Sequence, residues 1–264
     1  MTAQTVADAF RNVRGDVTRA VQNASSRSGV NFSYLMAQAA VESGYRPDAK
    51  AGSSSAEGLY QFLKGTWLNV VRDHGAKHGL GEYARALEKG AVDPKTEQAI
   101  LALRRDPAMS ALLAAEHARD NKTHLEQSVG GRVGDTDLYL AHFLGANGAE
   151  KFLKNLRADP GRGAAELFPD AAQANRTVFY DQGRARSLGE VRTFLANKLD
   201  DAAKQTRTVS VKGPIFASEG ARPRNAVPEV MWLGDPALGR PKFAASAEML
   251  LLTLSEVENK KSIL

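Results

Sequence analysis

Apolar residues recur every three or four positions through most of the first 200 residues of this 264-residue chain. In the stretch from Thr5 to Ser28 they form one stripe along a helix, which Gly29 can end. No stretch shows the sustained alternation of apolar and polar residues that is typical of a strand. The sequence therefore predicts an all-α fold. Further helices are expected over about 32–43, 58–73, 108–127, 138–145, 146–159 and 188–204.

Three of these helices carry residues that can cap them. Asn31, Asp135 and Ser187 each precede an apolar run and can accept a hydrogen bond from the first turn. Gly44 and Gly145 can stop the helices that they follow, because glycine adopts a left-handed backbone without steric cost.

The chain changes character after residue 204. Five of the ten prolines fall between Pro214 and Pro241, which favours an extended segment. We expect 1–204 to form the helical domain and 205–264 a Pro-rich extension. An apolar helix over about 244–258 ends this extension and either packs back on the domain or docks on a protein partner.

Composition excludes several classes of site. The chain has no cysteine, so disulfides, thiolate metal sites and a cysteine nucleophile are excluded. The formal net charge of +5 suits an anionic partner such as nucleic acid or cell wall. Basic and aromatic residues are not clustered, so we expect no nucleic-acid interface. No apolar run is long enough for a membrane span, and the start lacks the apolar run of a secretory signal.

Histidines at helical spacing raise the question of a metal site. His74 and His78 are four residues apart, but Gly75 and Gly79 weaken a helix there and no nearby carboxylate completes a set of metal ligands. His117 and His124 are expected to be solvated or hydrogen-bonded. We therefore expect neither a metal nor a cofactor.

Glu42 is the carboxyl group best placed for catalysis. It follows the mainly apolar run 35–41 at the C-terminal end of a predicted helix. Apolar neighbours and the negative end of the helix dipole both disfavour the ionised form, so we expect the carboxyl to keep its proton near neutral pH. A protonated carboxyl of this kind can act as a general acid. The other interpretation is a surface residue that follows a core stripe.

A series of short motifs surrounds Glu42. They are Glu42-Ser43, Pro47, Ser53 to Ser55, Gly58-Leu59-Tyr60-Gln61 and Gly65-Thr66. In this order and spacing the chain resembles the soluble lytic transglycosylase (SLT) domain, a lysozyme-like family, over roughly residues 20–200. Asn121 looks like the third motif of that family.

The fourth motif of the family departs from its usual form. It commonly reads Ala-Tyr-Asn-x-Gly, whereas here Ala141-His142-Phe143-Leu144-Gly145 stands in its place. In the family the tyrosine is thought to hydrogen-bond the catalytic glutamate. Either His142 or Tyr139, three residues earlier on the same helical face, could take that role.

The resemblance implies cleavage of the β-1,4 bond between N-acetylmuramic acid and N-acetylglucosamine. Glu42 would act first as acid and then as base, and the sugar's own 6-hydroxyl would form a 1,6-anhydro product. The partner would be peptidoglycan glycan strands in the periplasm or cell envelope. The substrate-binding residues that the resemblance implies are Ser43, Ser53, Tyr60, Gln61, Asn121, Tyr139, His142 and Phe143.

Two points of the site stay open. Tyr60 and Phe62 either line the groove or belong to the core. Asp48 and Glu57 are the local candidates for a second catalytic carboxylate, but on a polar loop we expect both to be solvated. Two other functions also stay open: a hydrolysing lysozyme on the same scaffold, and a non-catalytic wall-binding component of an envelope machine or phage-like particle.

Overall fold

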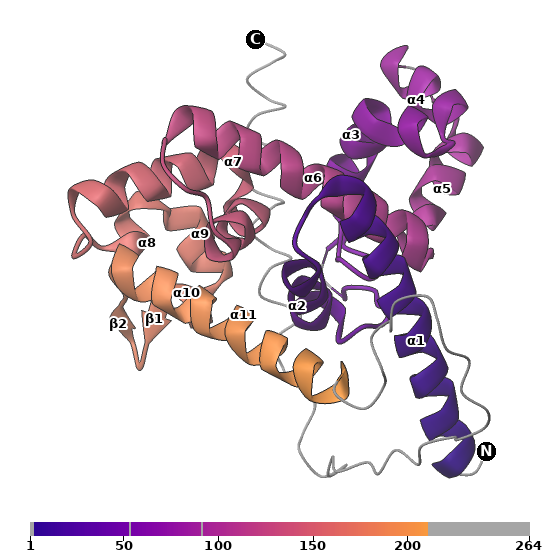
Figure 1. The fold of residues 1–264 in the computed structure, drawn as a ribbon. Helices are drawn as coiled ribbons and strands as arrows, with labels where there is room; N and C mark the ends of the chain where they lie inside the picture. Colours follow the sequence, from indigo (N-terminus) through magenta and orange to yellow (C-terminus); the bar gives the residue numbers. More distant parts are fainter. Residues whose placement is uncertain (1–2, 53, 91, 211–264) are drawn as a thin grey trace, which may run out of the picture.

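The computed structural model describes residues 3–52, 54–90 and 92–210, and this part of the chain is mainly helical (Figure 1). The prediction of an all-α fold is confirmed, with one small departure. A two-residue hairpin pairs β1 (Tyr180–Asp181) with antiparallel β2 (Arg184–Ala185). Residues 205–210 of the predicted extension continue a helix that ends at Ser210. The rest of the predicted extension, with the apolar helix over 244–258, lies outside the described residues.

The helices have the following bounds. The α-helices are α1 (Ala3–Ser28), α2 (Phe32–Ser43), α3 (Lys64–His74), α4 (Gly81–Glu88), α5 (Pro94–Ala102), α6 (Pro107–Ser128), α7 (Asp135–Ala158), α8 (Ala164–Leu167), α9 (Pro169–Ala174), α10 (Arg176–Phe179) and α11 (Leu188–Ser210). Two 3-10 helices, η1 (Gly75–His78) and η2 (Leu103–Arg105), follow α3 and α5.

Both ends of α2 have the predicted caps. The Asn31 side chain accepts a hydrogen bond of 2.8 Å from the Ser33 N–H at the start of the helix. Gly44 takes a left-handed conformation at the end, with φ of 62°, and its N–H donates to the Ala40 carbonyl at 3.0 Å. These caps hold Glu42 in the last turn of α2.

The predicted start of the next helix is wrong. Residues 58–63 form a tight loop, and α3 begins only at Lys64. Gly58 has φ of 88° and Gln61 has φ of 48°, and a right-handed helix cannot propagate through such residues. In sequence, the apolar residues of this loop resemble a helical repeat. In the structure they are buried because the loop itself turns into the core.

Gly145 interrupts α7 as the sequence predicted, with φ of 73° and ψ of 163°. The predicted cap at Asp135 is wrong, because the capping position is Gly134. The Asp137 carboxylate accepts a hydrogen bond of 3.0 Å from the Gly134 N–H, so the acidic side chain one turn in does the capping.

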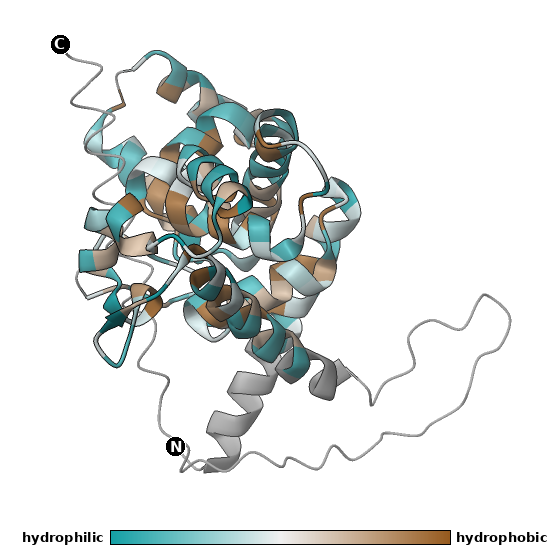
Figure 2. Cartoon of the chain, turned by 90° about the vertical axis from the view of Figure 1, so that its left-hand side faces the viewer, coloured by the Kyte–Doolittle hydropathy of each residue, from teal (hydrophilic) through white to brown (hydrophobic). Residues whose placement is uncertain are grey.

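The helices surround a core, and eight of the twelve residues of α2 are buried in it. α2 packs against α1 and α11, and α6 packs against α1 and α7 (Figure 1). Hydrophobic residues gather between the helices and hydrophilic residues face outward (Figure 2). The Trp67 indole is fully buried and donates to the Ile100 carbonyl at 2.8 Å, which ties α3 to α5. Among the residues described, no helix is long and apolar enough to cross a membrane.

Candidate active site

The Glu42 carboxyl is buried where the end of α2 meets α7. Only 4% of the residue is exposed. The Tyr139 hydroxyl donates a hydrogen bond to this carboxylate. The His142 Nε2 atom lies 3.4 Å from Glu42 Oε1, and that oxygen has no hydrogen-bond partner among the described residues. Helix α7 thus brings both residues that the sequence left as alternatives to the same carboxyl group.

The surroundings of Tyr139 keep its hydroxyl protonated. Burial raises the pKa of the Tyr139 hydroxyl well above its ordinary value, and the Glu42 carboxylate raises this pKa further. The hydroxyl therefore keeps its proton at neutral pH and serves as a donor. Its ring also stacks on the His142 ring, with centroids 6.1 Å apart and planes 19° from parallel, which fixes the imidazole.

A cation that the sequence analysis did not single out also faces Glu42. Lys198 is half-buried on α11, the helix that packs on α2. Burial lowers the pKa of the Lys198 ammonium, and the Glu42 carboxylate opposes this shift. Periodicity places Lys198 on a helix, but only the packing of α11 on α2 brings it to the site.

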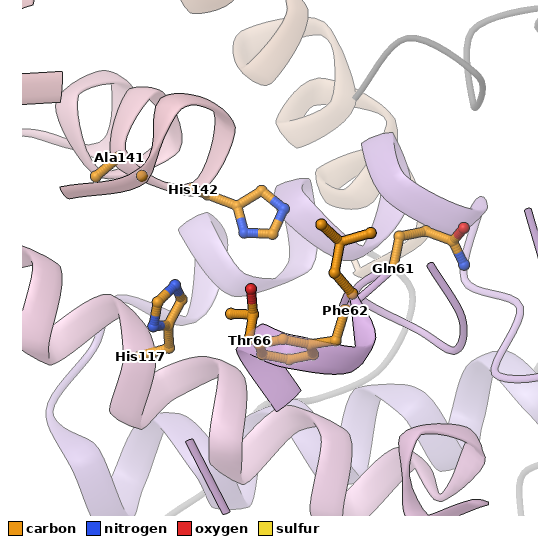
Figure 3. A pocket seen from close by; sticks show the side chains of 8 residues that line it. Gln61, Phe62, Thr66, His117, Ala141 and His142 are labelled. Atoms are coloured by element: carbon orange, nitrogen blue, oxygen red, sulfur yellow. The ribbon is translucent and has the colours of Figure 1, made fainter. Parts of the chain in front are cut away.

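A small pocket of about 80 Å³ adjoins this group. Three parts of the chain form its walls. They are the 58–63 loop together with the start of α3, helix α6, and helix α7 around Gly145. The residues that line it are Gln61, Phe62, Leu63, Thr66, His117, Ala141, His142 and Gly145. The His142 imidazole, the Thr66 hydroxyl and the His117 imidazole lie on facing sides of the pocket (Figure 3). Glu42 is not among the lining residues.

His117 is part of the pocket wall, although the sequence predicted only a solvated or hydrogen-bonded role. Burial, with smaller effects from His142 and His74, lowers the pKa of His117 to about 4. The ring is therefore neutral near pH 7 and can donate one hydrogen bond and accept another. Its position follows from the packing of α6 against α7, which spacing along α6 does not reveal.

Gln61 lines the pocket in a strained backbone conformation that its side chain supports. The Nε2 atom donates to the carbonyls of Gly58 at 2.8 Å and Ala49 at 3.1 Å. In Figure 3 the amide end points away from His142. The neighbouring Gly58 is required, because a Cβ there would lie 2.0 Å from the Arg104 carbonyl oxygen.

The two aromatic residues of the loop behave differently. Tyr60 is fully buried and does not line the pocket, so it is a core residue. Burial raises the pKa of its hydroxyl, which has no hydrogen-bond partner in the described part of the chain. Phe62 lines the pocket and packs edge-on against Trp67, with ring centroids 5.2 Å apart.

The other predicted binding residues lie around the site rather than in the pocket wall. The Ser43 hydroxyl donates to the Leu59 carbonyl at 2.8 Å and so joins the end of α2 to the loop. Asn121 is buried on α6, and Phe143 stacks on Phe179 in the core. Ser53 lies outside the described residues.

Glu57 is not the solvated acid that the sequence predicted. It is 6% exposed, and its two carboxylate oxygens each accept a hydrogen bond of 2.7 Å, one from Arg104 and one from Arg105. Arg104 also donates to the carbonyls of Ser55 and Phe62, so this ion pair holds the loop in shape. The side chains of Arg104 and Glu57 are 6% and 8% exposed, whereas that of Arg105 is 58% exposed, so the buried ion pair is the one with Arg104. Asp48 is exposed, as expected.

Carboxylates do face His74 and His78, contrary to the expectation from sequence. Asp120 lies 2.5 Å from His74 Nε2, and Glu116 lies 3.0 Å from His78 Nε2. Both acidic residues lie on α6, a helix well separated in sequence from His74 and His78. Arg119 also pairs with Glu116. The two histidine contacts join α3 and η1 to α6. The described residues contain no group of three or more His, Cys, Asp or Glu side chains suited to holding a metal ion.

Comparison with known protein families identifies the segment that contains Glu42. Residues 19–83 match the family model of the transglycosylase SLT domain. The matched segment runs from the second part of α1 to the start of α4 and includes α2, the 58–63 loop and α3. His117 and all of α7 lie beyond it. Within residues 19–83 the chain is therefore similar to the transglycosylase SLT domain.

Proposed function

We propose that the protein is a peptidoglycan lytic transglycosylase and that Glu42 is its acid and base. The observation that carries the proposal is a buried carboxyl at the end of α2, close to a small pocket, within a segment that matches the SLT domain. The substrate would be glycan strands of the cell wall, in the periplasm or cell envelope.

In the first half of the reaction, protonated Glu42 is the source of the proton that the glycosidic oxygen takes as its bond to C1 breaks. In the second half, the carboxylate takes up a proton as the sugar's 6-hydroxyl bonds to C1. The product is a 1,6-anhydro end. The hydroxyl of Tyr139 steadies the carboxylate between the two halves, because it donates to it and does not ionise near neutral pH.

The surroundings of Glu42 support a mechanism with one carboxylate. A usual retaining or inverting glycosidase needs a second carboxylate across the scissile bond. Glu57 is engaged by Arg104 and Arg105, and Asp48 is exposed on the loop surface. The sugar's own hydroxyl then takes the part of the nucleophile.

The pocket size indicates how a strand binds. Pockets for small molecules commonly measure about 300–1,000 Å³, and this one measures about 80 Å³. It therefore takes one substituent of a sugar, while the rest of the strand lies outside. Thr66 and His117 line the pocket and offer polar groups to that substituent.

Replacement of Glu42 tests the proposal. We expect Glu42→Gln to abolish the release of soluble fragments from purified sacculi, because glutamine has almost the same shape but no transferable proton. Asp48→Asn is the matched control, since it removes an exposed carboxylate of the adjacent loop and should leave the rate unchanged. Release by Glu42→Gln at the wild-type rate would defeat the assignment.

Two observations favour a second function, that of a non-catalytic wall-binding component. Glu42 is absent from the pocket wall, and histidine stands where the family commonly has tyrosine. Binding of the wild-type protein to sacculi without release of fragments would support this function. A protein partner, reached through the segment 205–264, belongs to the same alternative.

A further inference from the structure

His142 belongs both to the pocket and to the surroundings of Glu42. It lines the pocket, and it also contacts the Glu42 carboxyl. Glu42 itself is 4% exposed and does not line the pocket. A sugar group in the pocket therefore meets the imidazole before it meets the carboxyl.

The imidazole is also oriented for two contacts at once. Its Nε2 atom is directed at Glu42 Oε1, a buried oxygen with no hydrogen-bond partner among the described residues. The residue His142 is 7% exposed, and its ring stacks on the Tyr139 ring, so the imidazole is held in place. This leaves the Nδ1 atom as the ring nitrogen available to the pocket.

A neutral imidazole has one nitrogen that donates and one that accepts. The distance of 3.4 Å between Nε2 and Oε1 is longer than a good hydrogen bond. Contacts between catalytic groups are often long without substrate and shorten in the reacting complex. The pair is therefore placed to form a hydrogen bond once a ligand is bound.

We propose that His142 relays the proton between Glu42 and the scissile bond, an inference that rests on the proposed transglycosylase function. In the first step Glu42 gives its proton to Nε2, Nδ1 gives its proton to the glycosidic oxygen, and the C1–O bond breaks. In the second step the 6-hydroxyl gives its proton to Nδ1 as its oxygen bonds to C1, and Nε2 returns a proton to Glu42. His142 ends each cycle in its starting tautomer.

Chemical rescue of His142→Ala in the full chain tests the relay. We expect the rate of fragment release from sacculi to fall roughly 100-fold or more, the usual size of a general acid–base contribution. Added imidazole should restore the rate at least about 10-fold, a part of that contribution, because the free ring can occupy the space and exchange protons at both nitrogens. Added 1-methylimidazole should restore nothing, because its methylated nitrogen cannot pass a proton.

His142→Gln is a second test, and it does not depend on a small molecule filling the space left by the imidazole. Glutamine keeps a hydrogen-bonding side chain of similar size but cannot relay a proton, so the same loss is expected. Turnover by His142→Gln at the wild-type rate would overturn the relay. So would a loss in His142→Ala that imidazole does not reverse, or one that 1-methylimidazole reverses equally well.

The same assay distinguishes a failure of the proposed function from a failure of the relay alone. A wild-type protein that releases no fragments would overturn the proposed function together with the relay. An active wild type, an inactive Glu42→Gln variant and an unrescued His142→Ala variant would overturn the relay alone and leave Glu42 as a direct acid.

Discussion

At the scale of single residues, the site is a carboxyl group defined by its neighbours. Tyr139 donates to Glu42, His142 approaches its other side, and Lys198 adds a positive charge from α11. These three residues are remote from Glu42 in sequence. The motif order predicted Glu42, Gln61 and His142 as site residues, whereas the positions of His117 and Lys198 follow only from how the helices pack.

Tyr139→Phe removes the hydroxyl donor and leaves the ring that stacks on His142. A hydrogen bond to a charged group contributes about 1.5–3 kcal/mol, so its loss should slow fragment release roughly 10- to 100-fold. Steady-state assays on sacculi measure this effect. Tyr83→Phe, on α4 away from the described pocket, is the matched control and should keep the wild-type rate. Equal rates for the two variants would show that the hydroxyl has no part in turnover.

At the scale of elements, the loop between α2 and α3 sets the position of Gln61 relative to α7. Ser43 ties the loop to α2, and the ion pair of Glu57 with Arg104 ties it to η2. The backbone of Gly58 lies directly against Arg104. The shape of the pocket wall therefore depends on contacts that lie behind it.

Gly58→Ala is expected to destabilise the protein strongly. The new Cβ would lie 2.0 Å from the Arg104 carbonyl oxygen, at a residue whose φ is 88°. Incompatible backbone conformations of this kind cost about 1–3 kcal/mol before the clash is added. Urea unfolding monitored by circular dichroism measures the change.

Gly65→Ala is the control for that variant, because a Cβ there meets nothing within 4 Å and α3 already contains this residue. It should be neutral or stabilise the protein by up to about 1 kcal/mol, as alanine does in helices. Unfolding curves for Gly58→Ala that coincide with those of the wild type would contradict the role given to the loop.

The long helices were predictable and the loop was not, for a physical reason. α1, α2, α6 and α11 each carry several turns of apolar repeat, and caps at Asn31 and Ser187 mark two starts. The loop 58–63 has the same apolar spacing, but two positive φ values turn it into the core. Short helices such as α8 and α10 hold only four residues each, too few for a repeat to appear.

At the scale of the whole molecule, the matched family segment supplies part of the site. Residues 19–83 carry Glu42, Gln61 and Thr66, whereas His117 and His142 come from α6 and α7. The site thus needs elements well beyond the matched segment. The buried residues of α11 pack over α2 and extend the same core.

A chain that ends after Ser210 is expected to retain fragment release within about threefold, a change of less than about 1 kcal/mol in the activation free energy. Every described residue of the site lies before that point. We expect the segment 211–264 to serve placement in the cell instead. Assays of the shortened and full chains on the same sacculi compare them directly. Complete loss of turnover in a folded, shortened chain would contradict this division.

The most direct test of the central claim is mass spectrometry of the muropeptides that the protein releases from purified sacculi. The proposed mechanism predicts 1,6-anhydro ends from the wild-type chain and no released products from Glu42→Gln. Reducing ends would show a hydrolysing lysozyme, and anhydro products from Glu42→Gln would show that another group moves the proton.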